Sequence, residues 1–594
     1  MDKSDLNTQQ KDEPVGTFRT IREGIEALGI ALILVFLFKA YIVELYCIPT
    51  GSMASTLMGR HKDVSCEACG FPFQISASKE SNDGQESPRS RKELPHIIGG
   101  TCPQCQFTMY IGADNLAGQR HLSYSGDRIF VNKCLFSYRK PSRWHVTVFR
   151  YPASPQTNYI KRLVGLENET VMLRNGQVFV QKNGNDHFEI QRKPLRVLLS
   201  MMRTVDDNNY VLPAIHELGW KTRWYGNEHW LRSADYKSFT GTGTPDETSW
   251  LKFRYIVPTT ADWYQLIREQ LPEGNCGTPQ LITDSLDYNT EIPQDPLVPR
   301  SDVFSVETPQ SGMRQMCQRS LDGIGLNWVG DLVMRCTLNA KTSESIIIFN
   351  LVKGGINFQC RLWFDSDASF ATFSIPEVPE FEPFSVKVPI RIGRNHDVMF
   401  CNVDEEMRLI IDGKEIDTQG RGCYDALCLD GGLLCRDRSP TVLDLEPAAI
   451  GMMGEASVCV ENLKIMRNMY YISCDRQMDG RCDLVESPFR SFHLAHLGYE
   501  EEVKVILSNP AYWTNFGKTH KTVFKLDADQ FLMCGDNSAQ SKDSRLWTTD
   551  GIPYYVDRQY LIGEAFYVFW PHGLRIPGTP LALIPNVQKM RWID

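Results

Sequence analysis

The chain has 594 residues, 42% of them hydrophobic, and its formal net charge is −9 at pH 7. This length allows several domains, and the hydrophobic fraction is ordinary for a protein with packed cores. The acidic balance, without a dense run of Lys or Arg, argues against a nucleic-acid-binding protein. Eighteen cysteines indicate metal sites, an oxidising compartment or both.

An apolar run, residues 24–45, follows a polar amino-terminal stretch, and its centre from Ile30 to Phe38 carries no charge. A helix needs about 20 mostly apolar residues to cross a bilayer. The run therefore predicts a transmembrane helix. The alternative is a cleaved secretion signal, but the small-residue step of a cleavage site does not follow the run.

The basic residues around this run predict its orientation. Four of them precede it, Lys3, Lys11, Arg19 and Arg22. After Lys39 no Lys or Arg occurs until Arg60. The positive-inside rule then places the amino terminus in the cytoplasm and the remainder of the chain outside.

Two C-x-x-C pairs come next, Cys66 with Cys69 and Cys102 with Cys105, separated by a polar loop. Four thiolates can close a tetrahedral shell around one Zn²⁺. We expect a zinc-ribbon-like insert with a structural zinc. Two disulfides are the alternative, but a bridge within C-x-x-C would close a strained small loop.

Strand patterns dominate the remainder of the chain. The stretches "DRIFVNKCLF", "RWHVTVFRYP" and "NYIKRLVGL" predict strands, and "ETVMLRN" with "QVFVQKNG" predicts a hairpin through Asn175-Gly176. From about 190 to 475, short strands at regular spacing predict a β-sandwich. There "NHDVMFCNVDEEMRLIIDGKEI", with a turn at Asp412-Gly413, resembles a lamin-G or concanavalin-like jelly roll.

Four short stretches carry the candidate chemistry: "IPTGSMASTL" (48–57), "SGDRIFVNK" (125–133), "NYIKRLVGL" (158–166) and "FLMCGDNSAQSKDSR" (531–545). In this order, behind an amino-terminal apolar run, they resemble the signature boxes of the type I signal peptidases, which are membrane-bound Ser/Lys endopeptidases. The resemblance covers less than half of the chain. It implies a mainly β protein with a catalytic domain in three parts and large inserted accessory domains.

The expected organisation, in chain order, is a cytoplasmic tail (1–23), a transmembrane helix (24–45), a first catalytic part (46–65), a zinc-ribbon-like insert (66–121), a second catalytic part (122–190), an inserted β-sandwich (191–475), a connecting segment (476–520) and a third catalytic part (521–594).

A serine hydroxyl is a weak nucleophile until a base takes its proton, and a lysine can be that base if burial lowers its pKa. In "YIKRLV", strand alternation puts Tyr159, Lys161 and Leu163 on one face. If this face is the interior, Lys161 is packed among apolar side chains, while Arg162 points the other way, solvated or paired. The alternative for Lys161 is an ordinary strand lysine that reaches solvent.

The resemblance assigns further roles. It implies that Ser52 is the nucleophile, Lys161 the general base, Thr50 an oxyanion-hole donor and Ser541 the hydroxyl that orients the lysine amine. It also implies a charged frame around the site: Asp536, Asp543, Arg545 and Arg162. The chain departs from the family pattern at three positions, where Ser55 replaces a proline, Ser538 an arginine and Thr50 the commoner serine.

The function that this resemblance implies is removal of signal peptides from exported preproteins by a serine endopeptidase. The expected substrates are A-x-A-type preproteins, the expected surroundings are membrane lipid and the protein-export machinery, and catalysis needs no cofactor. The expected location is the bacterial plasma membrane, with the catalytic domain outside the cytoplasm.

Two alternatives stay open. One is a membrane-tethered binding protein that uses the jelly roll on an inactive peptidase scaffold. The other is a soluble self-cleaving Ser/Lys repressor, which the apolar run and the lack of a DNA-binding helix pair oppose.

Overall fold

The computed structural model describes residues 15–82, 93–112, 121–182, 187–244, 247–272, 277–295, 303–309, 312–320, 323–343, 345–364, 368–424, 438–473, 482–491, 499–574 and 584–594. The fold is mainly antiparallel β, as the sequence predicts. Several strand pairs join segments that are hundreds of residues apart in the chain.

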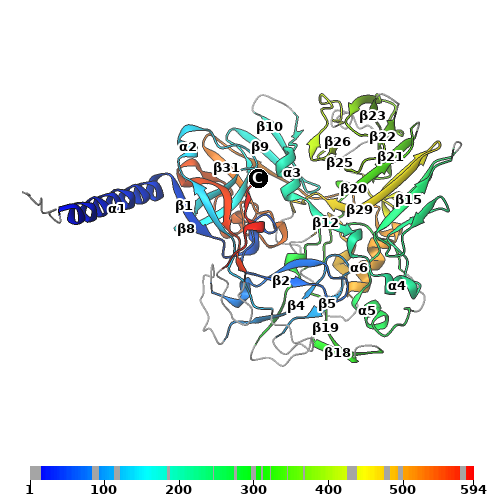
Figure 1. Cartoon of the computed structure of the whole chain (residues 1–594), viewed down its shortest axis with the longest axis horizontal. Helices are drawn as coiled ribbons and strands as arrows, with labels where there is room; N and C mark the ends of the chain where they lie inside the picture. Colours follow the sequence, from blue (N-terminus) through cyan, green and yellow to red (C-terminus); the bar gives the residue numbers. More distant parts are fainter. Residues whose placement is uncertain are drawn as a thin grey trace, which may run out of the picture.

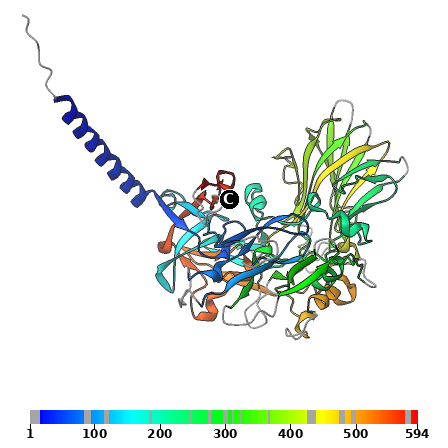
Figure 2. The same ribbon diagram turned by 60° about the horizontal axis from the view of Figure 1, so that its bottom comes forward.

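The amino-terminal helix α1 (Val15–Tyr41) projects away from the rest of the molecule (Figures 1 and 2). Its large apolar side chains are exposed, among them Ile25, Leu28 and Phe36. Among the described residues, no helix combines the length and the apolar character that a membrane crossing requires. The last residues of the apolar run are strand, because β1 (Val43–Cys47) pairs with β6 (Arg128–Asn132).

A first sheet unites all three expected catalytic parts, in the order β1-β6-β33-β7-β8-β31-β32, with β36 paired to β33. Its other strands are β7 (Val146–Tyr151), β8 (Ser154–Gly165), β31 (Gln530–Cys534), β32 (Val556–Asp557), β33 (Leu561–Trp570) and β36 (Arg591–Trp592). Buried residues of β6, β7 and β33 pack with Ile48, Met53 and Leu57. The candidate serine loop therefore rests on this sheet.

A smaller sheet, β11-β10-β9-β30, lies beside the first. It contains β9 (Glu169–Arg174), β10 (Gln177–Lys182), β11 (Glu189–Ile190) and β30 (Lys521–Lys525). The hairpin through Asn175-Gly176 is confirmed, and both residues have the positive φ that a tight two-residue turn needs. The prediction of a continuous strand through "KCLF" is wrong, because α2 (Leu135–Tyr138) begins there after β6 ends at Asn132.

The two C-x-x-C pairs lie in a module with its own sheets. One is the hairpin of β2 (His61–Ser65) and β3 (Pro72–Ser76). The other has the order β17-β4-β5-β19-β18, made of β4 (His96–Thr101), β5 (Thr108–Tyr110), β17 (Ile292–Gln294), β18 (Val303–Thr308) and β19 (Gly312–Cys317). Strands β17, β18 and β19 thus belong to the cysteine module, although the sequence analysis placed them in the sandwich.

Two large antiparallel sheets form the sandwich. The first has the order β14-β15-β29-β20-β25-β26-β27 with β12 on β29, and comprises β12 (Arg203–Asp207), β14 (Trp230–Arg232), β15 (Ser238–Thr242), β20 (Leu332–Ala340), β25 (His396–Val403), β26 (Glu406–Ile411), β27 (Lys414–Glu415) and β29 (Ser457–Arg467). The second has the order β13-β16-β28-β21-β22-β23-β24 and comprises β13 (Trp224–Gly226), β16 (Ser249–Phe253), β21 (Ile346–Lys353), β22 (Ile356–Phe364), β23 (Ser369–Ser374), β24 (Phe384–Val388) and β28 (Ala448–Met453).

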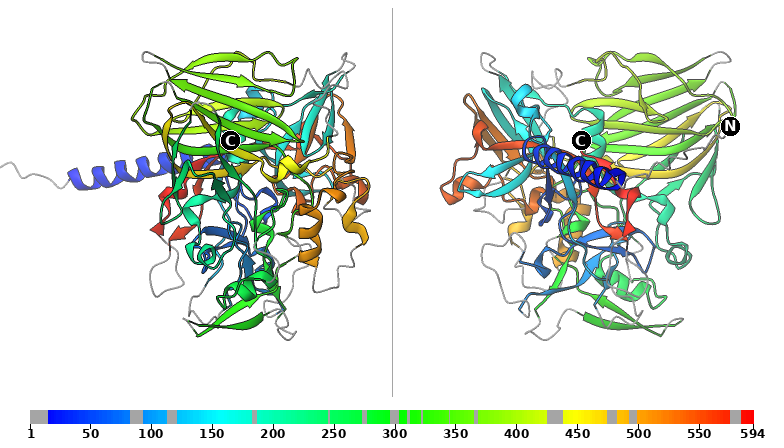
Figure 3. Two further views of the ribbon diagram at one scale, coloured as in Figure 1. Left: turned by 90° about the vertical axis from the view of Figure 1, so that its right-hand side faces the viewer. Right: turned by 60° about the vertical axis from the view of Figure 1, so that its left-hand side comes forward.

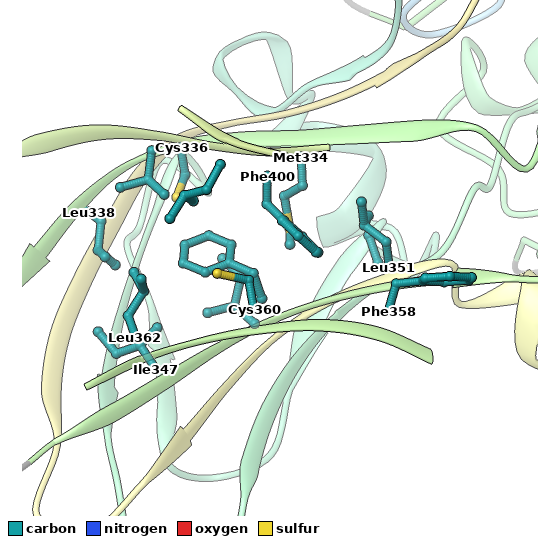
Figure 4. Packing of buried hydrophobic residues seen from close by; sticks show 14 of the residues in the cluster. Met334, Cys336, Leu338, Ile347, Leu351, Phe358, Cys360, Leu362 and Phe400 are labelled. Carbon is teal, nitrogen blue, oxygen red and sulfur yellow. The ribbon is translucent and has the colours of Figure 1, made fainter. Parts of the chain in front are cut away.

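One apolar core fills the space between these two sheets (Figure 4). Cys336 and Cys360 are buried in this core as free thiols, and Cys401 is buried in a neighbouring cluster. Cys459 is a free thiol that is partly exposed. The turn at Asp412-Gly413 joins β26 to β27 with positive φ at both residues, as predicted.

Short helices lie beside the sheets (Figure 3). They are α3 (Leu195–Met201), α4 (Pro213–Glu217), α5 (Thr260–Leu266) and α6 (Tyr499–Ser508). α6 packs through Val503 and Ile506 into a cluster with Trp513 and Leu281. The only remaining strand pair among the described residues is β34 (Gly573–Leu574) with β35 (Ile584–Pro585).

Candidate active site

Ser52 is the middle residue of a short 3-10 turn, η1 (Gly51–Met53), held against the catalytic sheet. Met53 is fully buried and anchors the turn. A Cβ atom on Gly51 would lie 2.0 Å from Cε1 of Tyr288, so only glycine fits beside this ring. The short turn and the ring of Tyr288, which is remote in sequence but adjacent in space, together fix where the Ser52 hydroxyl lies.

Lys161, on β8, contacts this hydroxyl. Its Nζ lies 2.7 Å from Ser52 Oγ and donates a second hydrogen bond to the Ile160 carbonyl at 2.9 Å. The side chain is buried, and burial lowers the pKa of the amine to about 8, although the charge of Asp543 opposes this shift. The predicted encounter between strand lysine and turn serine is therefore present, and a useful fraction of the amine is neutral near neutral pH.

Arg162 and Asp536 form a fully buried ion pair behind the lysine. Arg162 Nε and Nη2 donate to the two Asp536 oxygens at 2.9 and 2.7 Å, and Thr56 Oγ1 donates to Oδ2 at 2.5 Å. Burial alone would raise the pKa of Asp536, but Arg162 holds it below its usual range. Of the two expectations for Arg162, solvated or paired, the structure shows the paired one.

A second ion pair joins Asp543 and Arg545, with distances of 2.8 and 2.7 Å. Asp543 Oδ2 also accepts the Gly535 N–H at 2.7 Å. Arg545 contacts Ser538 through both its hydroxyl and its carbonyl, and Ser538 Oγ accepts the Ile472 N–H at 2.8 Å. Ser538, which stands where the signal peptidase pattern has an arginine, thus contacts the charged frame.

Ser541 is buried close to this frame but does not hold the lysine amine here. A Cβ atom on Gly535 would lie 2.1 Å from Ser541 Oγ and 2.5 Å from the Ser52 carbonyl, so Ser541 lies at the site. It also helps to lower the pKa of Asp543. Among the described residues, however, its hydroxyl has no hydrogen-bond partner of normal geometry. Thr50 immediately precedes η1 in extended conformation, and its side chain does not cap the turn.

Three residues that the sequence analysis did not single out hold the serine turn in place. Asn289, in η4 (Asp287–Asn289), exchanges two side-chain hydrogen bonds with Asn537 at 2.8 and 2.7 Å. Asn537 in turn bonds the Gly51 carbonyl through its side chain and the Ser52 carbonyl through its N–H. Tyr288, beside Asn289, bonds the Arg60 carbonyl. No local pattern reveals this contact, because η4 is more than 200 residues from Ser52.

The four cysteines of the C-x-x-C pairs come together as free thiols. Cys66 and Cys105 sulfurs are 3.5 Å apart, those of Cys69 and Cys102 3.7 Å, and all four lie within 4.8 Å of one another. Tetrahedral zinc with Zn–S bonds of about 2.3 Å requires S···S separations of about 3.8 Å. The cluster fits a structural Zn²⁺, and the alternative disulfides are not formed.

A second group of potential ligands, His61, Asp63 and His572, also lies within 4.8 Å. Here the ammonium of Lys589 lies 3.0 Å from Asp63 Oδ2 and 3.1 Å from His572 Nε2. This group is a hydrogen-bonded cluster that joins β2 to the residues after β33.

Comparison with known proteins gives a partial match. The profile of the family "Signal peptidase, peptidase S26" matches residues 119–214, which contain Lys161. A signal peptidase I of Pseudomonas aeruginosa is 38% identical over 76 residues, 10% of this chain and 27% of that protein. One of Pseudomonas fluorescens is 31% identical over 123 residues, 15% of this chain and 43% of that protein.

A third signal peptidase I, of Aquifex aeolicus, is 41% identical over 46 residues, 8% of this chain and 18% of that protein. The chain therefore matches less than half the length of each of these relatives. These similarities support a signal peptidase of the S26 family, over a small part of a much larger chain.

Solved structures resemble the chain only weakly. A carbohydrate-binding module of Bacillus subtilis has a TM-score of 0.20 and 8% identity, covering 41% of this chain and 95% of the module. A galectin of Caenorhabditis elegans has a TM-score of 0.15 and 11% identity, covering 28% of this chain and 91% of the galectin. At these scores the likeness defines neither the fold of the sandwich nor its ligand.

Proposed function

We propose that the chain is a serine endopeptidase of the signal peptidase I type, with Ser52 as nucleophile and Lys161 as general base. The observation that carries the proposal is the 2.7 Å contact between Lys161 Nζ and Ser52 Oγ, made by a buried amine whose pKa is lowered to about 8. A buried lysine with a lowered pKa beside a hydroxyl is the arrangement that activates a serine without histidine.

In the acylation step, neutral Lys161 takes the Ser52 proton while Oγ attacks the substrate carbonyl carbon. The resulting oxyanion accepts hydrogen bonds from the Ser52 N–H and the Thr50 hydroxyl, and one such donor lowers the barrier by about 2.7–4 kcal/mol. Lys161 then protonates the leaving amine, and the C–N bond breaks. In the second half, Lys161 activates a water that hydrolyses the Ser52 ester, releases the acid and restores the hydroxyl.

The buried pairs Arg162–Asp536 and Arg545–Asp543 act in this proposal as positioning groups. They flank the lysine strand and the segment that follows β31, and neither contacts Ser52 Oγ. A small rotation of the Ser541 hydroxyl toward the amine would give it the orienting role that the resemblance implies. It has no competing partner of normal geometry among the described residues.

The finer assignments belong to the same proposal. Substrates are exported preproteins with A-x-A-type signal peptides, delivered by the export machinery and bound as an added strand beside the serine turn. The exposed apolar side chains of α1 would contact membrane lipid and keep the amino terminus in the cytoplasm and the catalytic domain outside the bacterial plasma membrane. The sandwich is a jelly-roll accessory domain, inserted in the catalytic domain together with a zinc-ribbon-like module.

Cleavage of a preprotein by the detergent-solubilised chain tests the proposal. We expect one cut after the A-x-A site, and a loss of about 10³-fold or more in Ser52→Ala and in Lys161→Met. Ser154→Ala is the matched control, because Ser154 is an exposed serine on the same strand as Lys161. Unchanged cleavage by Ser52→Ala would refute the nucleophile, whereas absence of cleavage by the wild-type chain would favour the tethered binding protein.

Zinc analysis tests the metal. We expect one Zn²⁺ per chain, lost when Cys66 is replaced by Ser, and retained when Cys459, a free thiol in the sandwich, is replaced in the same way. Absence of bound zinc from protein prepared with zinc would contradict the assignment.

A further inference from the structure

A cavity of about 650 Å³ lies where the serine loop, the cysteine module and the first sandwich sheet meet. Ser55 and Met58 line it from the serine loop, Phe73 from β3, Val205 from β12 and Asp287 from η4. Its volume is within the range of small-molecule sites in proteins. Neither the peptidase proposal nor the resemblance to signal peptidases uses it.

Three arginines also line this cavity, Arg203, Arg319 and Arg467. Arg203 on β12 and Arg467 on β29 are direct partners in the antiparallel ladder. Like charges directly opposite each other in a sheet are destabilising. The repulsion between two arginines that are ladder partners beside this cavity therefore needs a compensating interaction.

The described part of the chain does not supply a salt bridge to either of these two arginines. Arg467 donates to the carbonyls of Asn468 and Ser285, at 3.0 and 2.5 Å. Arg203 donates only from Nη1, to the carbonyls of Ser200 and Met202 at 3.3 and 3.0 Å.

Other polar atoms at the cavity are also unsatisfied. Arg203 Nη2 is buried without a hydrogen-bond partner, and so is Nε of Arg319, whose Nη1 pairs with Glu500 at 3.0 Å. A buried donor without a partner is uncommon, and it indicates a missing ligand, ion or water.

Nearby carboxylates act on these arginines only at longer range. Asp284 and Asp287 favour the charged form of Arg467, and Asp536 and, to a smaller extent, Asp287 favour that of Arg203. Burial nevertheless lowers the pKa of both guanidinium groups, that of Arg467 to about 10, with the charge of Arg203 adding to the effect. The positive charge of the pair is therefore incompletely compensated by the protein.

We propose that this cavity binds a small ligand through an oxyanion, either a carboxylate or a phosphate, held between Arg203 and Arg467. The planar guanidinium presents parallel N–H donors that match the oxygens of both groups. One bound oxyanion would separate the two like charges. The apolar lining, including Phe73 and Val205, would take the body of the ligand.

Isothermal titration with inorganic phosphate and with citrate, at constant ionic strength in chloride, tests this site. We expect saturable binding of at least one probe to the wild-type chain, weakened at least tenfold in Arg203→Gln and in Arg467→Gln. The phosphate and citrate arms identify which oxyanion the cavity prefers. Arg335→Gln is the matched control, since Arg335 lies in the same sheet, exposed and paired with Asp397.

Two further measurements keep the result decisive. Thermal unfolding of each variant shows that it is folded, and Arg467→Lys, which keeps the charge but loses the fork of donors, should retain weak binding. The titrations do not depend on peptidase activity, so they can also be made on Ser52→Ala. The proposal is overturned if neither probe binds the wild-type chain saturably, or if both Arg→Gln variants bind as the wild type does.

Discussion

The molecule buries arginines in two regions, and it treats their charges differently. Beside the serine turn, Arg162 and Arg545 each meet a buried carboxylate through two nitrogens, at 2.7 to 2.9 Å. At the cavity, Arg203 and Arg467 are ladder partners, and within the described part of the chain they donate only to backbone carbonyls. A buried guanidinium paired within the chain positions the backbone, whereas one that lacks a carboxylate is suited to a ligand.

Removing a carboxylate from the paired region should have the largest effect. Asp536→Asn leaves Arg162 charged and buried without its partner, and breaking a buried pair costs about 3–5 kcal/mol. We expect a loss of this size in the unfolding free energy, measured by urea denaturation. The control, Asp397→Asn, breaks the surface pair with Arg335 and should cost less than about 1 kcal/mol. Equal losses in the two variants would remove the distinction between buried frame and surface pair.

The next largest effect should be on the pH dependence of cleavage. Lys161 lies in the paired region, but among the described residues its amine bonds a hydroxyl and a carbonyl rather than a carboxylate. Burial lowers the pKa of its amine to about 8, and only the neutral form accepts the Ser52 proton. The rate constant kcat/KM should therefore rise about tenfold per pH unit up to about pH 8 and level off above it.

A steady-state pH profile of the wild-type chain measures this, with unfolding monitored at each pH as the control. A rate that stays constant from about pH 6 to about pH 9 would contradict a lysine base with this pKa.

How far the sequence predicts this site depends on the distance between the residues concerned. Alternation within "YIKRLV" puts Lys161 and Arg162 on opposite faces of the strand, but it does not predict that both are buried. The position of Ser52 in a short turn is a local property. The Asn175-Gly176 hairpin is equally local, and the spacing of the two C-x-x-C pairs predicts that the four cysteines meet.

Other features depend on long-range packing. The chain leaves the sandwich after β16, builds β17–β19 on the cysteine module and returns at β20, so a boundary drawn from strand spacing alone misses the excursion.

Asn289 is the strongest case of such a long-range contribution, and its removal should have an intermediate effect. Asn289→Ala leaves the Asn537 amide without its buried partner, and an unsatisfied buried group costs about 1–3 kcal/mol. Since Asn537 holds the carbonyls of Gly51 and Ser52, we expect kcat to fall about tenfold with little change in KM.

The measurement is a steady-state assay normalised to the amount of folded enzyme. Asn515→Ala, which removes an exposed amide bonded to Glu486, is the control and should leave kcat unchanged. If kcat of Asn289→Ala equals that of the wild type after normalisation to folded enzyme, Asn289 contributes only to stability.

The smallest effect should come from the unpaired region, and its sign should be opposite. In chloride, Arg203→Gln removes one of two like charges placed opposite each other, and relief of such a pair is worth about 0.2–1 kcal/mol. We therefore expect a slightly larger unfolding free energy, whereas Arg203→Lys, which keeps the charge, should show no gain. A loss comparable with that of Asp536→Asn would show that Arg203 is compensated within the chain, and the difference between the two regions would then be one of geometry alone.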